Sequence, residues 1–173
     1  PSVLDEEWEK VNNNPDKPFI NRATAGLYPP GSAFKVFTLS AALAFGVVSE
    51  ADTFTCKGKE RVAGTVVTCH NEKGHGRIPL RVAFTQSCNI AFAKIGLRLG
   101  ADKFQEMAER FLLDRRFDLP VQTSRPRVPE GEEMTPAMLA ECSFGQGALL
   151  VTPLHLTMIA AAIANGGEMV RPW

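Results

Sequence analysis

The stretch Tyr28-Pro29-Pro30-Gly31-Ser32-Ala33-Phe34-Lys35 marks the start of a central helix. Proline has no amide hydrogen and restricts the residue before it, so residues 28–31 cannot be helical. Directly after them, residues 33–48 carry a single charge, Lys35, among apolar side chains. A helix that is apolar on all sides is buried in a core, and Gly46 is its expected stop.

Ser32 and Lys35 form a candidate catalytic pair at the beginning of this helix. Residues three apart share a helix face, so the hydroxyl and the amine can meet. Free backbone N–H groups of the first turn point toward incoming negative charge. Burial lowers the pKa of a lysine, and a neutral amine can take the proton of a serine. The same spacing also fits a capping serine beside a lysine whose amine reaches solvent.

Composition places the chain among ordinary soluble domains. It has 173 residues with 19 Lys and Arg against 19 Asp and Glu, and 45% of its residues are hydrophobic. This length suits one domain with a real core. Zero net charge argues against a nucleic-acid binder or a polybasic membrane binder. Residues 148–167 lack Asp, Glu, Lys and Arg, but polar residues and Pro153 interrupt them, so we expect a buried helix rather than a membrane span.

The remaining pattern predicts a mixture of helices, loops and one strand-rich excursion. Residues 85–89 form a polar break inside an otherwise helical stretch. The expected elements, in chain order, are a surface helix and loop up to residue 21, a short strand or hairpin within 52–79, helices on both sides of the break in 80–99, an amphipathic helix around 104–111, a long loop over 114–135, and a helix between Thr152-Pro153 and Asn165-Gly166-Gly167.

Two further segments carry polar groups suited to a site. In Ser87-Cys88-Asn89, alternate residues can place Ser87 and Asn89 in one cleft with Cys88 turned away. Such a pair can shuttle a proton and hold a substrate amide, although Ser and Asn also favour simple interhelical turns. The second segment, Phe144-Gly145-Gln146-Gly147, reads on its own as a flexible turn.

Together and in this order, the three segments resemble the transpeptidase domain of penicillin-binding proteins, in particular the high-molecular-weight, transpeptidase-only class B type. The runs 21–35 and 145–156, with Asn165-Gly166-Gly167, are similar to that class almost residue for residue. The resemblance covers essentially the whole chain. It implies an α+β fold of the serine transpeptidase and β-lactamase type.

The resemblance also implies an activity and the residues that carry it. Ser32 would be acylated by a peptidoglycan stem peptide ending in D-Ala-D-Ala, and by β-lactams, which resemble that substrate. Its backbone N–H would be one oxyanion donor. The remaining implied residues are Lys35 as the base, Ser87 and Asn89 lining the cleft, and Gln146 and Gly147 at the substrate. The implied setting is the extracytoplasmic face of the cell membrane, with cell-wall synthesis proteins as partners and any anchor outside this chain.

One departure from the family pattern is as informative as the match. Family members carry Lys-Thr-Gly on a strand soon after the Asn-Gly-Gly stop, but this chain ends at Trp173, 173 − 167 = 6 residues after Gly167, and does not begin with methionine. We therefore expect residues 1–173 to be a partial transpeptidase domain, mainly helical, with most of the central antiparallel sheet missing. Alone it should have little or no transpeptidase activity.

Cysteine and histidine side chains gather in the excursion and at the polar break. One interpretation is a Cys56–Cys69 disulfide, which suits a protein outside the cytoplasm. The other is a structural Zn²⁺ held by Cys56, Cys69, His75 and Cys88, a set similar to the metal site of some elongation-type relatives. Zinc is favoured because Cys88 and His75 are otherwise unexplained, and Cys88 would link the metal to Ser87 and Asn89. We expect His70 to be exposed and Cys142 to be a core thiol.

Two other functions remain open. A serine β-lactamase would need a base that activates water, and the acidic stretch 130–133 is the only ambiguous source. Ser87-Cys88-Asn89 also lacks the middle aspartate of class A β-lactamases. A zinc-stabilised module that only binds or senses β-lactams would keep the serine for recognition.

Overall fold

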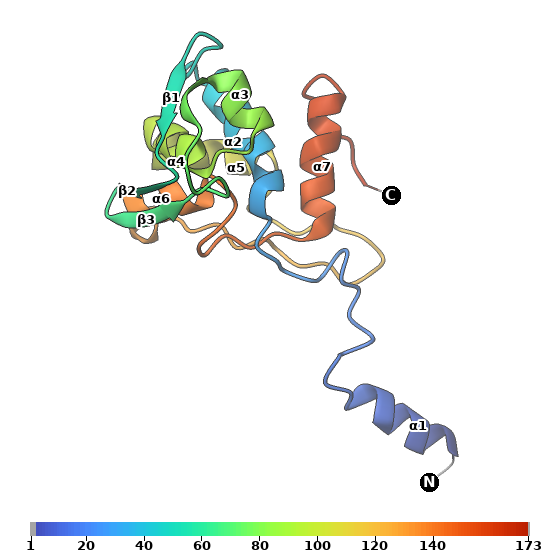
Figure 1. The fold of residues 1–173 in the computed structure, drawn as a ribbon. Coiled ribbons are helices and arrows are strands. Elements are labelled where there is room, and N and C mark those ends of the chain that lie inside the picture. Colours follow the sequence, from blue (N-terminus) through green and yellow to red (C-terminus); the bar gives the residue numbers. More distant parts are fainter. Residues whose placement is uncertain (1–2, 173) are drawn as a thin grey trace.

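The computed structural model describes residues 3–172. Within this range, seven α-helices, two 3₁₀ turns and four short strands are joined by loops (Figure 1). The first half contains α1 (Val3–Asn12), the 3₁₀ turn η1 (Gly31–Phe34), α2 (Lys35–Ala44), β1 (Thr53–Cys56), β2 (Lys59–Val62), β3 (Thr65–Thr68) and β4 (Gly76–Pro79). The second half contains α3 (Leu80–Thr85), α4 (Asn89–Leu99), α5 (Ala101–Arg110), η2 (Gly131–Glu133), α6 (Pro136–Cys142) and α7 (Pro153–Ala164).

Helix α2 and the turn η1 form one continuous helical segment in the core. The helix predicted within 33–48, with its stop at Gly46, is confirmed and ends at Ala44. Its first turn is a 3₁₀ turn that already starts at Gly31, a residue predicted to be non-helical. Gly46 stops it in the left-handed conformation, φ +63°, which costs glycine little. Phe34 and Phe37 are fully buried, and their rings stack with centroids 4.5 Å apart. This packing fixes the direction in which Ser32 and Lys35 leave the helix.

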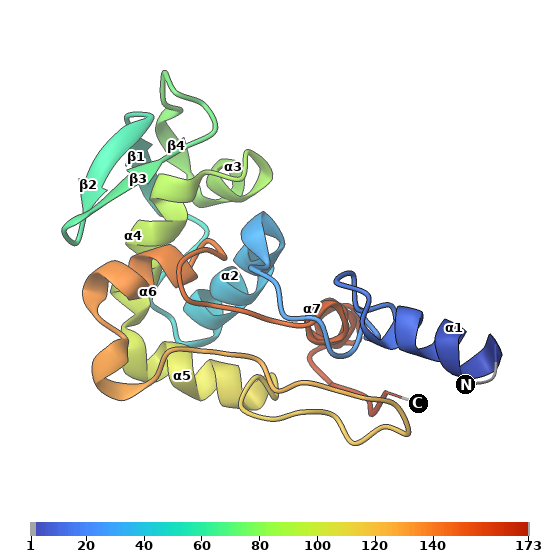
Figure 2. The same ribbon diagram turned by 90° about the horizontal axis from the view of Figure 1, so that it is seen from below.

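The four strands form two separate antiparallel pairs rather than one sheet. β1 pairs with β4 from Thr53↔Pro79 to Cys56↔Gly76, and β2 pairs with β3 from Lys59↔Thr68 to Val62↔Thr65. The range 52–79 predicted as an excursion encloses all four. Their inward side chains pack with α4, and both pairs lie on the side of α4 away from α7 (Figure 2).

Helix α7 stands beside α2, and it is less buried than the sequence predicts (Figure 1). His155, Met158, Ile159 and Ala162 are buried on one face, whereas Ile163 on the other face is 37% exposed. The helix predicted between Thr152-Pro153 and Asn165-Gly166-Gly167 is therefore confirmed, but the prediction that it is buried is correct for one face only. The lack of charged residues in 148–167 predicted burial on all sides of this helix. Within residues 3–172, however, no element covers the face that carries Ile163, where alanines predominate.

The long loop 114–135 is held in place at several points. The buried ring of His155 stacks on Phe117 with centroids 4.4 Å apart, and its Nε2 lies 3.0 Å from the Arg115 carbonyl oxygen. Because a carbonyl only accepts, Nε2 carries the proton. Burial lowers the pKa of His155, which favours this neutral form, while the Arg115 carbonyl raises it in part. Further along, the Ser124 hydroxyl donates to the Ala25 carbonyl over 2.8 Å.

Helix α1 projects away from the other elements and buries none of its residues (Figure 1). Its Trp8 ring packs on Phe19 with centroids 5.1 Å apart. The surface helix predicted for the first 21 residues is thus present. No helix within residues 3–172 has both the length and the apolarity needed to cross a membrane.

Candidate active site

Ser32 lies in the first turn of the η1–α2 segment, exposed at the surface. Gly31 precedes it with φ +58°, and its N–H donates to the Gly145 carbonyl over 2.9 Å. This reversal places the Ser32 side chain on the same helical face as Lys35, as the spacing predicts. The Ser32 hydroxyl is therefore accessible, while the Lys35 amine behind it is buried.

Lys35 is the most constrained polar side chain of the site. Its residue is only 1% exposed, and its amine has four oxygens within hydrogen-bond distance. They are Ser32 Oγ at 2.9 Å, Ser87 Oγ at 2.9 Å, the Ser87 carbonyl at 3.0 Å and Asn89 Oδ1 at 2.6 Å. The two segments singled out from the sequence therefore meet at this one nitrogen.

The chemistry of these partners suits a neutral amine. The Ser87 carbonyl and Asn89 Oδ1 can only accept, so they take the two N–H groups of a neutral lysine. Its single lone pair is then left to accept from one of the two serine hydroxyls, each 2.9 Å away. Burial lowers the pKa of Lys35 from 10.5 to about 8, and negative charge at Cys69 and Cys88 opposes this shift in part. Loss of the lysine proton thus comes within reach of neutral solution.

The polar break turns its residues to opposite sides, as predicted. Ser87 has a left-handed backbone, φ +50°, which costs a non-glycine residue roughly 1 kcal/mol or more. Ser87 and Asn89 face Lys35, while Cys88 is fully buried on the other side. Asn89 Nδ2 donates to the Thr68 carbonyl over 3.0 Å, and this bond directs its Oδ1 toward Lys35.

The turn with Gln146 and Gly147 reaches the site through its backbone. Gly145 touches Gly31, and both Gln146 and Gly147 are exposed beside that contact. Besides the bond from Gly31, the Gln146 N–H donates to the Glu141 carbonyl over 3.1 Å, and the buried Thr38 hydroxyl of α2 donates to the Ser143 carbonyl over 2.9 Å, and these bonds hold the turn. The turn therefore borders Ser32, but Gln146 has no side-chain bond to Lys35 among the described residues.

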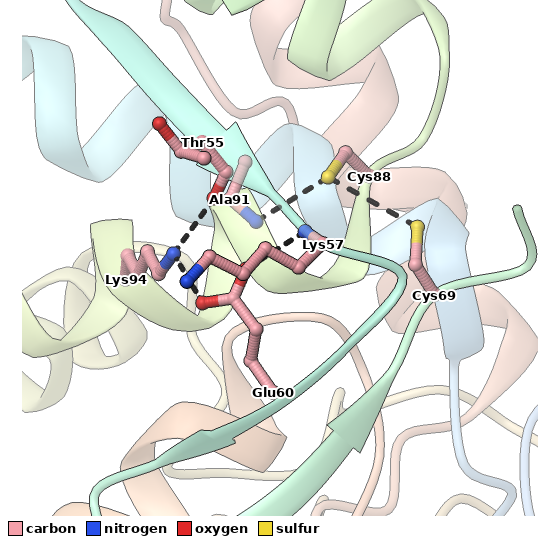
Figure 3. Close-up of polar contacts among 7 residues, drawn as sticks. All are labelled: Thr55, Lys57, Glu60, Cys69, Cys88, Ala91 and Lys94. Atoms are coloured by element: carbon pink, nitrogen blue, oxygen red, sulfur yellow. Dashed lines mark hydrogen bonds and ion pairs between the residues drawn. The ribbon is translucent and has the colours of Figure 1, made fainter. Parts of the chain in front are cut away.

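Behind the break, Cys56, Cys69, His75 and Cys88 converge. Their ligand atoms all lie within 4.8 Å of one another, and all four cysteines of the chain are free thiols. Figure 3 shows the sulfurs of Cys69 and Cys88 pointing toward each other at 4.0 Å. His75 Nδ1 lies 3.6 Å from Cys69 Sγ, whereas the exposed His70 lies 3.9 Å from it. Cys142 is buried elsewhere in the core.

The acidic stretch 130–133 lies away from Lys35. Glu130 and Gly131 line a small cavity with Ala101, which follows the C-terminal end of α4. Asn89 begins the same helix, and eleven residues span about 15 Å. No carboxylate of the described residues 3–172 hydrogen-bonds Lys35. This stretch therefore places no carboxylate beside Lys35 and Ser32 that could activate water.

The model of the penicillin binding protein transpeptidase domain matches residues 4–173. The chain belongs to this family. It is 38% identical to the peptidoglycan D,D-transpeptidase PbpA of Mycobacterium tuberculosis over all of this chain and 36% of that protein. It is 28% identical to the D,D-transpeptidase MrdA of Acinetobacter baumannii over 96% of this chain and 26% of that protein.

A solved structure gives the same result. The penicillin G acyl-enzyme complex of penicillin-binding protein A from M. tuberculosis superposes with a TM-score of 0.91 at 37% identity, over 100% of this chain and 40% of that one. The predicted family and α+β fold are thus confirmed. The chain spans only about a quarter to two-fifths of the length of these relatives, and residues 3–172 contain two two-stranded sheets in place of a larger one.

Several features of this candidate site could not be predicted from the sequence. The Thr68 carbonyl, which orients Asn89, and the Thr38 hydroxyl, which holds the turn, are far from their partners in the sequence. Neither lies in a recognisable motif. The sequence predicted a flexible turn at Gly145 and a non-helical stretch up to Gly31, but it did not predict the contact between these two glycines.

Gly145→Ala should lower stability far more than a comparable glycine substitution elsewhere. A Cβ at Gly145 would lie 1.9 Å from the Gly31 carbonyl oxygen, with φ +82°. Gly166 is the matched control, because it has φ +69° and open space around a Cβ. We expect the Gly145 variant to lose at least about 2 kcal/mol more than Gly166→Ala, seen as a difference of roughly 4–8 °C in Tm. Equal melting temperatures would show that the turn is not held against Gly31.

Proposed function

We propose that the natural full-length protein containing this chain is a penicillin-binding D,D-transpeptidase that cross-links peptidoglycan stem peptides through an acyl-enzyme on Ser32. The observation that carries this proposal is the buried Lys35 amine, 2.9 Å from the exposed Ser32 hydroxyl. The names of the relatives support it, since PbpA and MrdA are both peptidoglycan D,D-transpeptidases.

The geometry suits acyl transfer in two halves. Neutral Lys35 takes the Ser32 proton as Oγ attacks the carbonyl carbon of the penultimate D-Ala. The C–N bond then breaks, and the terminal D-Ala amine receives a proton that Lys35 passes on through Ser87 Oγ. Ser87 Oγ lies 2.9 Å from Lys35 Nζ. An acceptor amine from a second stem peptide reverses these steps, losing a proton to the site and releasing Ser32. Asn89, Gln146 and Gly147 would hold the peptide backbone.

β-Lactams would follow the first half only. Attack of Ser32 opens the lactam amide, and the amine remains attached to the acyl group, so it does not leave the cleft. Hydrolysis of the ester would need a water-activating base. Stretch 130–133 lies beside Ala101, after the C-terminal end of α4, whereas Lys35 contacts Asn89 at the start of that helix. Slow release is therefore favoured over β-lactamase turnover. A module that only senses β-lactams would also form an adduct that is released slowly, but it would not join two peptides.

The same proposal covers location and partners. Stem peptides of peptidoglycan lie outside the cytoplasm, so the site would work on the extracytoplasmic face of the cell membrane, through an anchor outside residues 3–172. Proteins of the cell-wall synthesis machinery would be its partners there.

We also propose a structural Zn²⁺ at Cys56, Cys69, His75 and Cys88. Tetrahedral zinc with sulfur ligands at about 2.3 Å and nitrogen at about 2.05 Å requires S···S near 3.8 Å and S···N near 3.6 Å. The Cys69–Cys88 sulfurs are 4.0 Å apart, and Cys69 Sγ is 3.6 Å from His75 Nδ1. A disulfide needs about 2.05 Å between sulfurs. The metal would hold the excursion against α4, and the acyl transfer itself would need no cofactor.

Ser32→Ala should abolish the covalent penicillin adduct. The natural full-length protein is incubated with fluorescent penicillin, and the labelled peptide is identified by mass spectrometry. Ser40→Ala is the control, because Ser40 lies further along α2, beyond Lys35. We expect label on the Ser32 peptide of the parent and the control, and none on the variant. Label retained by the Ser32 variant would refute the nucleophile. The isolated chain, lacking Lys-Thr-Gly, should form no stable adduct.

The acylation rate should rise with pH because Lys35 acts as a neutral base. With a pKa of about 8, the neutral fraction grows about tenfold from about pH 7 to about pH 9. Stopped-flow measurement of penicillin acylation should show this rise with an inflection near 8. Lys35→Arg keeps the charge at all pH values, so it should react slowly and without the inflection. A flat profile in the parent would exclude Lys35 as the titrating base.

Metal analysis and a thiol count test the zinc proposal. We expect about one zinc per chain, and four reactive thiols after denaturation with a chelator, since the chain has four cysteines. Cys56→Ala should lose the metal, while Cys142→Ala, which changes a core thiol outside the cluster, should keep it. Two reactive thiols and no metal would support the Cys56–Cys69 disulfide instead.

A further inference from the structure

Lys94 lies on α4 and fastens the turn between β1 and β2 to that helix. Its amine donates to the Thr55 carbonyl over 2.7 Å and pairs with Glu60 Oε2 over 2.7 Å (Figure 3). The other carboxylate oxygen, Glu60 Oε1, accepts the Lys57 N–H over 2.8 Å. The Lys94 and Glu60 side chains are 32% and 16% exposed, so water screens this pair less than it screens a surface pair.

The charge state of Glu60 agrees with a working ion pair. Burial alone would raise the pKa of this carboxyl. The bonds and charges of Lys94 and Lys57 outweigh that effect, and its pKa lies below the ordinary value. Glu60 is therefore ionised in neutral solution and can hold both the Lys94 amine and the Lys57 amide.

The turn held in this way also fixes the end of β3. Gly58 adopts φ +83°, and a Cβ there would lie 1.9 Å from the Glu72 carbonyl oxygen. Its own carbonyl accepts the Cys69 N–H over 2.7 Å. A shift of the turn away from α4 would thus carry residues 68–69 with it.

Residues 68–69 in turn reach the candidate active site. The Thr68 carbonyl accepts from Asn89 Nδ2 over 3.0 Å, and Asn89 Oδ1 contacts the Lys35 amine at 2.6 Å. The contacts therefore form a closed ring. It begins at Lys94 on α4, passes through the β1–β2 turn and the end of β3, and returns to Asn89 at the start of the same helix.

We propose that Lys94, through its ion pair with Glu60, is a positioning residue for the acylation of Ser32. It acts by holding the Thr68 carbonyl where that group orients Asn89 toward Lys35. This inference rests on the proposed acyl-transfer function. It adds a residue that lies outside all three sequence segments of the site and touches neither Ser32 nor Lys35.

The chain offers a matched control on the same helix. Arg98 of α4 pairs with Asp52, just before β1, over 3.4 Å, and their side chains are 47% and 35% exposed. This pair joins the same helix to the same excursion, but it has no bond to the β1–β2 turn or to residues 68–69. Removing the Arg98–Asp52 pair should therefore weaken the attachment of residues 52–79 to α4 and leave the ring of contacts from Lys94 to Asn89 intact.

The experiment measures acylation of the natural full-length protein by penicillin, separating the binding constant from the acylation rate constant. Lys94→Met keeps most of the stem and removes the charge. We expect its acylation rate constant to fall at least about fivefold, with binding little changed. Lys94→Arg should recover most of the rate, because a guanidinium can donate to both oxygens. Arg98→Met should match the parent protein.

Tm and bound metal are measured for every variant. A fall in rate for Lys94→Met beyond that of Arg98→Met, at similar Tm and metal content, supports the proposal. Equal rates in the two variants would overturn it, and so would a rate loss that simply follows metal loss or unfolding. Failure of the parent protein itself to acylate would instead refute the proposed function, so the two failures are distinguishable.

Discussion

The burial of one lysine amine is the constraint on which the rest of the structure depends. An amine as enclosed as that of Lys35 is tolerated only if polar partners surround it. The chain supplies four oxygens from two segments more than fifty residues apart. Because those oxygens must stay within about 3 Å, residues 87–89 and the start of α2 have to be held rigidly against each other. The remaining elements can be understood as the means of holding them.

Three different interactions hold these segments together: helix packing, a close contact between glycines, and a hydrogen bond. Helix α4 begins at the break itself and packs on α2, which gives the coarse position. The Gly31–Gly145 contact brings a third segment so close that a Cβ on Gly145 would lie 1.9 Å from the Gly31 carbonyl oxygen. The excursion 52–79 adds the Thr68 carbonyl, which sets the rotation of the Asn89 amide. Packing therefore sets the distance between segments, and hydrogen bonds set the orientation of the side chains.

Sequence reasoning reached the parts of this arrangement that are local. Apolar spacing located α2, α4 and α5, and alternation at 87–89 gave the two faces of the break. It missed α6, although Thr135-Pro136 has the same cap signal as Thr152-Pro153, because only seven helical residues follow it. The absence of charge in 148–167 overstated the burial of α7. Contacts such as Glu60 with Lys94 depend on how distant segments pack, and no local pattern encodes that.

Cys88 explains why the break can serve two sites. Its sulfur accepts the Ala91 N–H at 3.5 Å and so caps the first turn of α4, while the same atom faces Cys69. The left-handed Ser87 just before it reverses the chain, so the residues on either side of the sulfur face Lys35. A larger residue at 88 would have no space, since this position is fully buried. A smaller one would leave both the helix cap and the thiol cluster incomplete. The position of the candidate pair Ser32–Lys35 and the attachment of the excursion to α4 thus both depend on the Cys88 side chain, so a change at one of these sites would alter the other.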